Sequence, residues 1–328
     1  MNKTFLKILF YLIPAIVIVA SVFIGSSTLF SKKEIFEYIF SGFQTSNQTL
    51  DSIIFNIRIP RILITFMIGG TLAMSGNSLQ ATLKNPLVCP YILGLSSGAA
   101  FGAALSLAYL TIPIQISAFV FGFIAVLLTY IISMKKNNVS TVTIILAGVV
   151  VSGIFTALLT IVQFFSDPFK LQSIVSWTMG NLHNSSWEKF KIAFIPILVG
   201  TTILYFYKWK LNAIALGDEE AKTSGINVKR DKLIILFAVT LATSSAVAIS
   251  GVIGLFGLII PHITRMLVGV DNRISMPFNF LFGGSFLLII DDFSRSFFDF
   301  EMPIGVLTML IGAPFFIYLM KKNNIGWE

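Results

Sequence analysis

The sequence predicts an all-α polytopic membrane protein with ten transmembrane helices. Of its 328 residues, 55% are hydrophobic and only 12% are charged, and the mean hydropathy is +0.87. A helix needs about 20 mostly apolar residues to cross the hydrocarbon core, and such runs repeat along the whole chain. The basic residues lie in short segments between the runs, as topology signals do, and form no nucleic-acid-binding face. We therefore expect residues 1–328 to form a single transmembrane domain.

Six spans follow directly from uninterrupted apolar runs. The first run comes after Lys3 and Lys7, as in a secretory signal, but it is longer than a signal core and lacks an obvious small-residue cleavage site. It is therefore predicted to be a span. The six spans cover about residues 8–30, 62–83, 92–110, 114–134, 142–165 and 192–206.

The next apolar stretch, residues 233–264, needs a decision. It is uncharged over about 32 residues, which is too long for one ordinary span and short for two full ones. Its second half is interrupted by Gly251, Gly254, Gly257 and Pro261. We therefore predict a full span to about residue 250 and a short, broken span to about residue 268. Two further spans, about residues 275–290 and 304–320, bring the number to ten.

The distribution of positive charge favours an even number of spans. With ten spans and a cytoplasmic N-terminus, most lysines and arginines of the loops lie on the cytoplasmic side. With nine spans, Arg273, Lys321 and Lys322 would lie outside. Both termini are therefore predicted to be cytoplasmic. Among the exceptions to the trend are three arginines at outer span ends: Arg58, Arg61 and Arg295.

A short internal echo suggests two inverted five-helix halves. Ala73-Met74-Ser75-Gly76 recurs as Ala248-Ile249-Ser250-Gly251, and a segment broken by proline follows each copy. The two copies lie five spans apart, so the halves would have opposite orientations. A chance match in a chain rich in Gly and Ser remains the alternative.

The spans carry no Asp, Glu, Lys or Arg near their centres. Ion-coupled and proton-coupled carriers usually keep such groups at the midplane, so the energy source is predicted to be external. The chain has no phosphate-binding loop of its own. His183 and His262 have no metal-ligand companions nearby, so neither a metal site nor a catalytic centre is expected. The alternatives are a self-sufficient carrier or a channel, for which a midplane charge or a filter ring would be the mark.

Specific motifs add a resemblance to a known family. They are Arg58-Ile59-Pro60-Arg61; Ser75-Gly76 with Gln80; Asn85-Pro86-Leu87 through Pro90; Leu93-Gly94-Leu95-Ser96-Ser97-Gly98-Ala99; Leu146-Ala147-Gly148; Leu216-Gly217 with Ala221 and Gly225; Gly257-Leu258-Ile259-Ile260-Pro261-His262 with Arg265; Asp291 with Arg295; and Pro303-Ile304-Gly305 to Gly312-Ala313-Pro314. With these motifs the chain resembles the FecCD family of ABC importer permeases after residue 56. In one departure, Cys89 stands where the family usually has an acidic residue.

The resemblance implies a transporter subunit rather than an enzyme. Members of the family import ferric siderophores, haem or cobalamin across the bacterial cytoplasmic (inner) membrane. The implied complex contains a second permease subunit, identical or paralogous, two cytoplasmic ATPase subunits and an external substrate-binding protein. The partner ATPases would use ATP, and the permease itself would bind no cofactor. Membrane lipid surrounds it and nucleic acid plays no part. An iron chelate is the favoured cargo, with cobalamin or haem as alternatives and an ATP-independent carrier as a further one.

The resemblance also assigns roles to particular residues. Arginines equivalent to Arg58, Arg61 and Arg295 receive acidic residues of the binding protein, and guanidinium groups suit carboxylates; anchoring to lipid phosphate is the alternative. The loop of about residues 211–232 is expected to form two short helices that press into the ATPase, although it could be only a solvated connection. Its coupling residues are Leu216, Gly217, Ala221 and Gly225. Candidate gate residues at the cytoplasmic mouth are Asn85, Leu87, Ser140 and Thr141. Residues 165–180 are expected to form an interfacial helix carrying Trp177.

Overall fold

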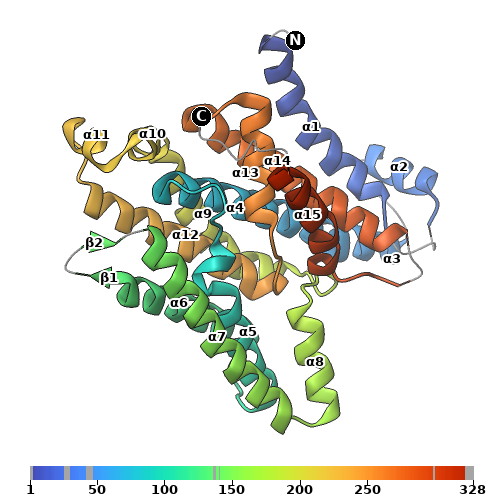
Figure 1. Cartoon of the computed structure of the whole chain (residues 1–328). Coiled ribbons are helices and arrows are strands. Elements are labelled where there is room, and N and C mark those ends of the chain that lie inside the picture. Colours follow the sequence, from blue (N-terminus) through green and yellow to red (C-terminus); the bar gives the residue numbers. More distant parts are fainter. Residues whose placement is uncertain are drawn as a thin grey trace.

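The computed structural model describes residues 3–25, 30–41, 47–135, 138–139, 141–297 and 300–321. Within these ranges the regular secondary structure is helical, apart from one antiparallel pair of two-residue strands, β1 (Met134–Lys135) and β2 (Asn138–Val139). Figure 1 shows the helices crossing one another at varied angles. The helices of the first half are α1 (Lys3–Phe23), α2 (Lys32–Phe40), α3 (Gln48–Ser52), η1 (Ile53–Arg58), α4 (Ile59–Leu83), η2 (Pro90–Leu93), α5 (Leu95–Ala108), α6 (Ile114–Ser133) and α7 (Thr141–Phe165).

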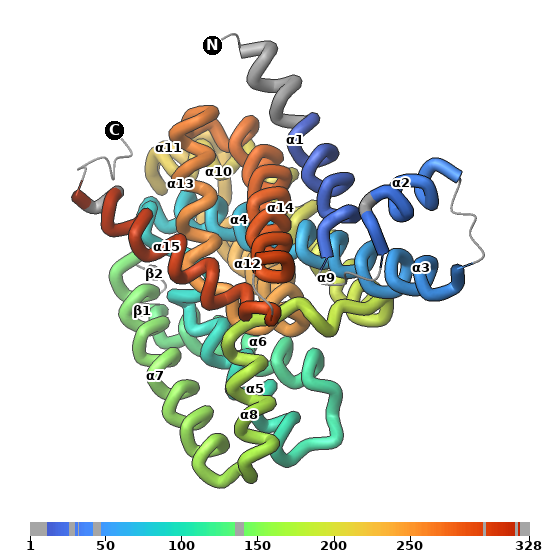
Figure 2. The backbone as a smooth tube through the Cα atoms, turned by 90° about the vertical axis from the view of Figure 1, so that its right-hand side faces the viewer, coloured from blue at the N-terminus to red at the C-terminus, as the bar shows by residue number. Residues whose placement is uncertain are grey.

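The second half begins with a helix that leaves the main bundle. The helices here are α8 (Pro168–Thr178), α9 (Trp187–Phe206), α10 (Lys208–Leu216), α11 (Asp218–Thr223), α12 (Val228–Ser250), α13 (Phe256–Val268), α14 (Asn272–Ser296) and α15 (Ile304–Lys321). In Figure 2, α8 lies at the opposite end of the molecule from α10 and α11. The helix predicted around Trp177 is therefore confirmed as α8, and its place at the lipid headgroups stays a prediction.

The predicted membrane spans agree with the helices of the structure. Within the described ranges, six helical segments are long and apolar enough to cross a membrane: Gln48–Leu83, Ile114–Ser133, Thr141–Phe165, Trp187–Phe206, Val228–Ser250 and Asn272–Ser296. Four shorter apolar helices cover Leu12–Phe23, Leu95–Ala108, Phe256–Val268 and Ile304–Tyr318. Each predicted span overlaps one of these ten segments. The all-helical membrane architecture is thus confirmed, and the number of complete crossings stays a prediction.

The long apolar stretch divides where the sequence predicts it. Helix α12 ends at Ser250, and residues 251–255 are not helical before α13 begins at Phe256. Gly251 has a φ of +71°, and a Cβ atom there would lie 2.2 Å from the carbonyl oxygen of Trp177. Only glycine fits both the conformation and the contact. The backbone N–H of Asn181 donates to the carbonyl oxygen of Ser250 at 2.8 Å and closes this helix end.

Two sets of contacts define the two ends of the helical bundle. At the first end, Lys84 pairs with Asp218 across 3.6 Å, and Asn212 on α10 donates to Asp271 in the α13–α14 turn at 2.7 Å. At the second end, the Lys170 ammonium group donates to the carbonyl oxygen of Ala108 at 2.7 Å. The first set brings the start of α12 and the end of α13 to the same end. These two helices therefore run out and back.

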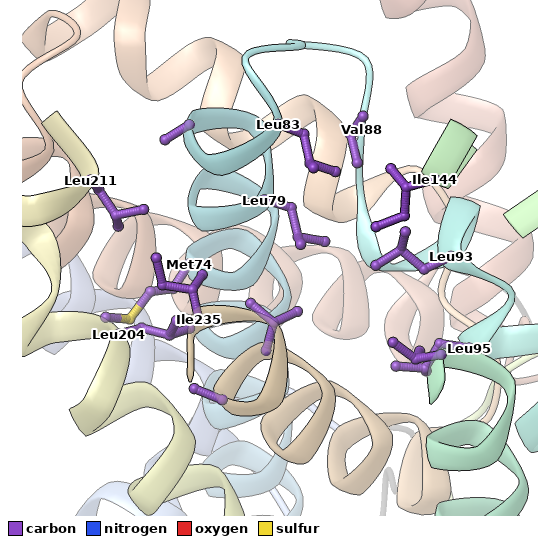
Figure 3. Packing of buried hydrophobic residues seen from close by; sticks show 14 of the residues in the cluster. Met74, Leu79, Leu83, Val88, Leu93, Leu95, Ile144, Leu204, Leu211 and Ile235 are labelled. Atoms are coloured by element: carbon purple, nitrogen blue, oxygen red, sulfur yellow. The ribbon is translucent and has the colours of Figure 1, made fainter. Parts of the chain in front are cut away.

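Helix α4 forms the centre of the bundle. Almost every residue from Pro60 to Leu83 is buried, against α9, α12, α13 and α14. Figure 3 shows Met74, Leu79 and Leu83 of this helix among apolar side chains from other helices. A Cβ atom on Gly76 would lie only 1.7 Å from the carbonyl oxygen of Gly257. Small residues thus let the α4 and α13 backbones touch, as in other membrane helix pairs.

The four-residue echo occupies unlike positions in the two helices. Gly76 lies inside α4, seven residues before its end, whereas Gly251 immediately follows α12. No span is predicted for residues 31–58, and there the structure forms α2, α3 and η1. The last two continue directly into α4, so that this helix begins at Gln48 rather than near residue 62. The inverted relation of the two halves stays a prediction.

The path of the chain predicts which positions share one side of the membrane. With Cys89→Ser as background, single cysteines at Val270 and Ser224 should react with a membrane-impermeant thiol reagent only from the cytoplasmic side, because both are exposed at the α10–α11 end. Asn184→Cys, which is exposed beyond α8, should react only from outside. Labelling of intact and lysed protoplasts measures this. Reaction of Val270→Cys and Ser224→Cys from opposite sides would contradict the out-and-back path.

Candidate functional site

The three arginines predicted for docking form a buried cluster at the second end of the bundle. Arg61 makes a double contact with Asp291, with Nη2 to Oδ1 at 2.8 Å and Nε to Oδ2 at 3.0 Å. Its Nη1 also bonds Glu301 Oε2 at 2.9 Å. Arg295 pairs with Asp292 and donates to the carbonyl oxygen of Ser21 at 3.1 Å. These contacts join α1, α4 and α14 to the segment before α15.

Arg58 differs from the other two. Its Nη1 donates to the backbone carbonyl oxygen of Val22 at 2.6 Å, and it pairs with no carboxylate in the described part of the chain. All three arginines are buried: Arg58 and Arg61 are 5% exposed and Arg295 is 3% exposed. Among the described residues, the carboxylates of Asp291, Asp292 and Glu301 pair with Arg61 and Arg295. The structure places the arginines together, as expected, but inside the protein and not on an open cationic face.

The predicted coupling loop forms two short helices at the first end. Leu216, at the end of α10, is 78% exposed, whereas Ala221 on α11 is completely buried. Gly217 separates the two helices, and Gly225 has a φ of +77° with open space around its Cα. The expected helix–turn–helix is confirmed. Of the two apolar side chains predicted for coupling, Leu216 faces outward and Ala221 packs within the chain.

Charged residues fix the start of α11. The Lys232 ammonium group bonds both carboxylate oxygens of Asp218 at 2.8 Å, and Lys84 lies 3.6 Å from Oδ1. Burial acts to raise the pKa of Asp218, but the bonds with Lys232 and Lys84 outweigh it and hold the pKa below its usual value. The carboxylate also sits in the first turn of the helix, where the dipole favours negative charge. The loop is therefore attached to the ends of α4 and α12.

Three of the four candidate gate residues lie close together beside the loop. Thr141, the first residue of α7, donates its hydroxyl to the carbonyl oxygen of Leu83 at 2.8 Å. The Asn85 side chain accepts from the backbone N–H of Leu87 at 2.9 Å and shapes the turn after α4. Ser140 lies outside the described residues. The arrangement brings the start of α7 against the end of α4, and the gate role stays a prediction.

Another contact joins two residues of the sequence motifs. Arg265 on α13 donates through Nη1 to Gln80 Oε1 on α4 at 2.7 Å. Gln80 is completely buried. A hydrogen bond with a charged donor is stronger than one between neutral groups. The pair therefore holds the C-terminal part of the short helix α13 against α4.

Sequence reasoning missed a cavity of about 430 Å³ at the second end. It lies among α6, α8, α9 and the end of α12. Polar side chains of Gln115, Gln172, Ser176, His183 and Lys189 line it together with Trp177. These residues come from separate segments and follow no motif, so only the fold brings them together. Within the described residues, no group of three or more His, Cys, Asp or Glu side chains could hold a metal ion.

Comparison with known proteins gives one consistent result. Residues 12–322 match the model of the FecCD transport family. The chain is 40% identical over 280 residues to the molybdate import system permease protein of Haemophilus influenzae, covering 84% of this chain and 83% of that protein. It is 36% identical over 281 residues to the cobalamin import system permease protein of Halobacterium salinarum, covering 85% and 76%.

A solved structure agrees over nearly the whole chain. It is described as an inward-facing conformation of a metal-chelate type ABC transporter, and it superposes with a TM-score of 0.85 at 36% identity. The match covers 98% of this chain and all of that one. The helical membrane fold, the ordered motifs and the family match over residues 12–322 lead to the same assignment. The chain belongs to the FecCD transport family and is a multi-pass membrane permease of the ABC importer type.

Proposed function

We propose that this chain carries an iron chelate across the bacterial cytoplasmic membrane, driven by separate ATPase subunits that bind α10 and α11. The binding of ATPase subunits is supported most directly by Leu216, which faces outward at the junction of two short, anchored helices. An exposed leucine between charged residues suits a groove on a partner protein. With α10 and α11 at the ATPase side, both chain termini are cytoplasmic and all ten apolar helices cross the membrane.

Two observations support an iron chelate as the cargo. The similar solved structure is described as a metal-chelate type transporter, and the spans have no charged residue at their centres. A pathway without fixed charge suits a bulky chelate that is selected elsewhere, by an external binding protein. A second permease subunit, as in the proposed complex, would complete the pathway. Relatives of similar identity serve cobalamin and molybdate, so these are the competing cargoes.

Uptake measurements test the proposed cargo. Cells that lack the gene should lose ATP-dependent uptake of a radiolabelled ferric hydroxamate chelate, and expression of this chain should restore it. Uptake of labelled cobalamin and of molybdate should be equal in the two strains. Restoration of cobalamin or molybdate uptake alone would refute the iron chelate while leaving the importer intact. Failure of this chain to restore ATP-dependent uptake of the ferric hydroxamate chelate would refute the proposed cargo.

The burial of the arginines narrows the proposed docking role to Arg58. Arg61 and Arg295 are occupied by carboxylates of their own chain, and replacing Arg61 by Glu would bury a third carboxylate beside Asp291 and Glu301. Arg58 uses only a backbone oxygen, so its guanidinium group can exchange that partner for a carboxylate of the binding protein. Arg61 and Arg295 then hold the platform from which Arg58 acts.

A pair of variants separates these two roles. Arg58→Gln should weaken the affinity for the external binding protein about tenfold while thermal stability changes little, since it removes one charged contact. Arg61→Gln should lower the free energy of unfolding by about 3 kcal/mol, because it leaves Asp291 buried without its partner. Binding is measured by titration in nanodiscs and stability by thermal melting. Equal effects of the two variants on both quantities would contradict the division.

Leu216 gives the corresponding test at the ATPase side. Leu216→Asp should weaken association with the ATPase subunits at least about tenfold, because it places a charge in an apolar contact. The melting temperature of the permease alone should stay unchanged, since the side chain touches little of its own chain. Ser224→Asp, which changes another exposed position, beyond α11, is the matched control. Copurification and ATP hydrolysis of the complex provide the measurements, and an unaffected complex in Leu216→Asp would exclude this contact.

A further inference from the structure

A chain of side-chain amides runs from the coupling loop into the centre of the bundle. Asn77 on α4 donates from Nδ2 to Asn272 Oδ1 at 2.7 Å. Asn272, the first residue of α14, donates from Nδ2 to Asn212 Oδ1 on α10 at 2.9 Å. Asn212 in turn donates to Asp271 Oδ1 at 2.7 Å. Three helices that are far apart in sequence are thus joined by three consecutive hydrogen bonds.

The chain of amides has one direction. Asn77 donates at the start of the chain, Asn272 and Asn212 each accept with the oxygen and donate with the nitrogen, and the last acceptor is the carboxylate of Asp271. That carboxylate cannot donate when ionised. Bonds from Arg273 and from Asn212 hold the pKa of Asp271 far below its usual value. The charged end of the chain therefore fixes the orientation of all three amides.

These bonds differ in kind from the apolar contacts beside them. Leu211 and Ile214 of α10 are completely buried against the same core. Apolar contacts have no direction, so they allow one helix to slide over another at modest cost. Asn77 and Asn272 are each only 2% exposed, and breaking their bond would leave buried polar groups unsatisfied. The amides thus fix the register of α10 on α14 and α4.

We propose that Asn272 is a positioning residue that makes α4 follow the displacement of α10 when ATP binds. This inference rests on the proposed function, because it takes α10 and α11 as the place where the ATPase acts. When the loop moves, Asn212 carries the start of α14 with it, and Asn272 carries Asn77. Without the amides the loop can move while α4 stays in place.

The test uses a thiol near the far end of α4 and needs no cargo. Ile57→Cys, with Cys89→Ser as background, lies in η1 and is half-exposed. The complex with its ATPase subunits is reconstituted in nanodiscs without the binding protein. In the parent, the rate of modification of this thiol should differ at least about fivefold between the nucleotide-free and the vanadate-trapped complex, a difference typical of coupling between sites. In Asn272→Leu the two rates should be equal while ATP hydrolysis continues.

Asn279→Leu is the matched control. Asn279 is a completely buried asparagine on the same helix, and its nitrogen bonds only the carbonyl oxygen of Ser275 within α14. It should keep the parental difference. Asn212→Ala changes the half-buried end of the chain of amides and should also make the two modification rates equal. If Asn272→Leu fails to assemble, Asn212→Ala alone tests the proposal. The double variant Asn77→Leu with Asn272→Leu should be no worse than either single change, because the residues act as a unit.

Several results would overturn the proposal. A parental difference preserved in Asn272→Leu, or in Asn212→Ala if that variant must decide, would show that α4 does not depend on the amides. Loss of the difference in Asn279→Leu would show that any buried amide of α14 has this effect. A parent whose two rates are equal would show that α4 does not follow the loop. Failure of the proposed function would appear differently, as a chain that binds no ATPase or supports no ATP-dependent uptake.

Discussion

The close packing around α4 is the constraint on which the rest of the structure depends. This helix is buried on nearly all sides, so each neighbour must meet it at a fixed depth. The contact of Gly76 with the carbonyl oxygen of Gly257 leaves no room for a side chain. It therefore sets where the short helix α13 lies, and Gln80 holds the same helix through Arg265. Because lipid provides no hydrophobic force between helices, such close contacts and hydrogen bonds have to hold the bundle together.

The polar groups of the protein gather at the two ends of this central helix. At one end, Arg61 and Asp291 form a buried ion pair. At the other end, the amides of Asn77, Asn212 and Asn272 lead to the coupling loop. Buried polar groups of this kind are costly unless every partner is present. The two ends therefore act as fixed attachments, and the apolar middle of α4 lies between them.

Much of the fold could be predicted because hydrophobic runs and breakers are local signals. The division near Gly251 follows from glycines that the sequence shows directly. The early start of the helix at Gln48 could not be read in this way, because polar and charged residues interrupt the apolar run before Ile59. The burial of the arginines could not be predicted from the sequence either. Arg61 lies 230 residues from Asp291, and a charge at a span end gives no sign of a partner so distant in sequence.

The candidate site divides in the same manner. The two short helices of the coupling loop follow from local pattern, and the resemblance indicates Leu216 as a coupling residue and Asn85 as a candidate gate residue. The burial of Ala221 depends on packing against other helices, which no local pattern contains. The amides are harder still, since Asn77 and Asn272 are single residues separated by 195 positions. Only the antiparallel packing of α4 and α14 brings them within a hydrogen bond.

Two of the apolar helices, α5 and α13, are short for a membrane crossing, which makes their fit to the bilayer important. Helices α5 and α13 have 14 and 13 residues, which corresponds to about 20 Å of rise each against a hydrocarbon core of about 30 Å. With all ten apolar helices crossing as proposed, the backbone that precedes these two, in η2 and at residues 251–255, lies at hydrocarbon depth, where irregular backbone is tolerated only under a cover of protein. The mismatch between these short helices and the hydrocarbon core therefore changes with the thickness of the bilayer. Thicker or thinner lipid then acts on α13, which packs against α4, and on the transporter through it.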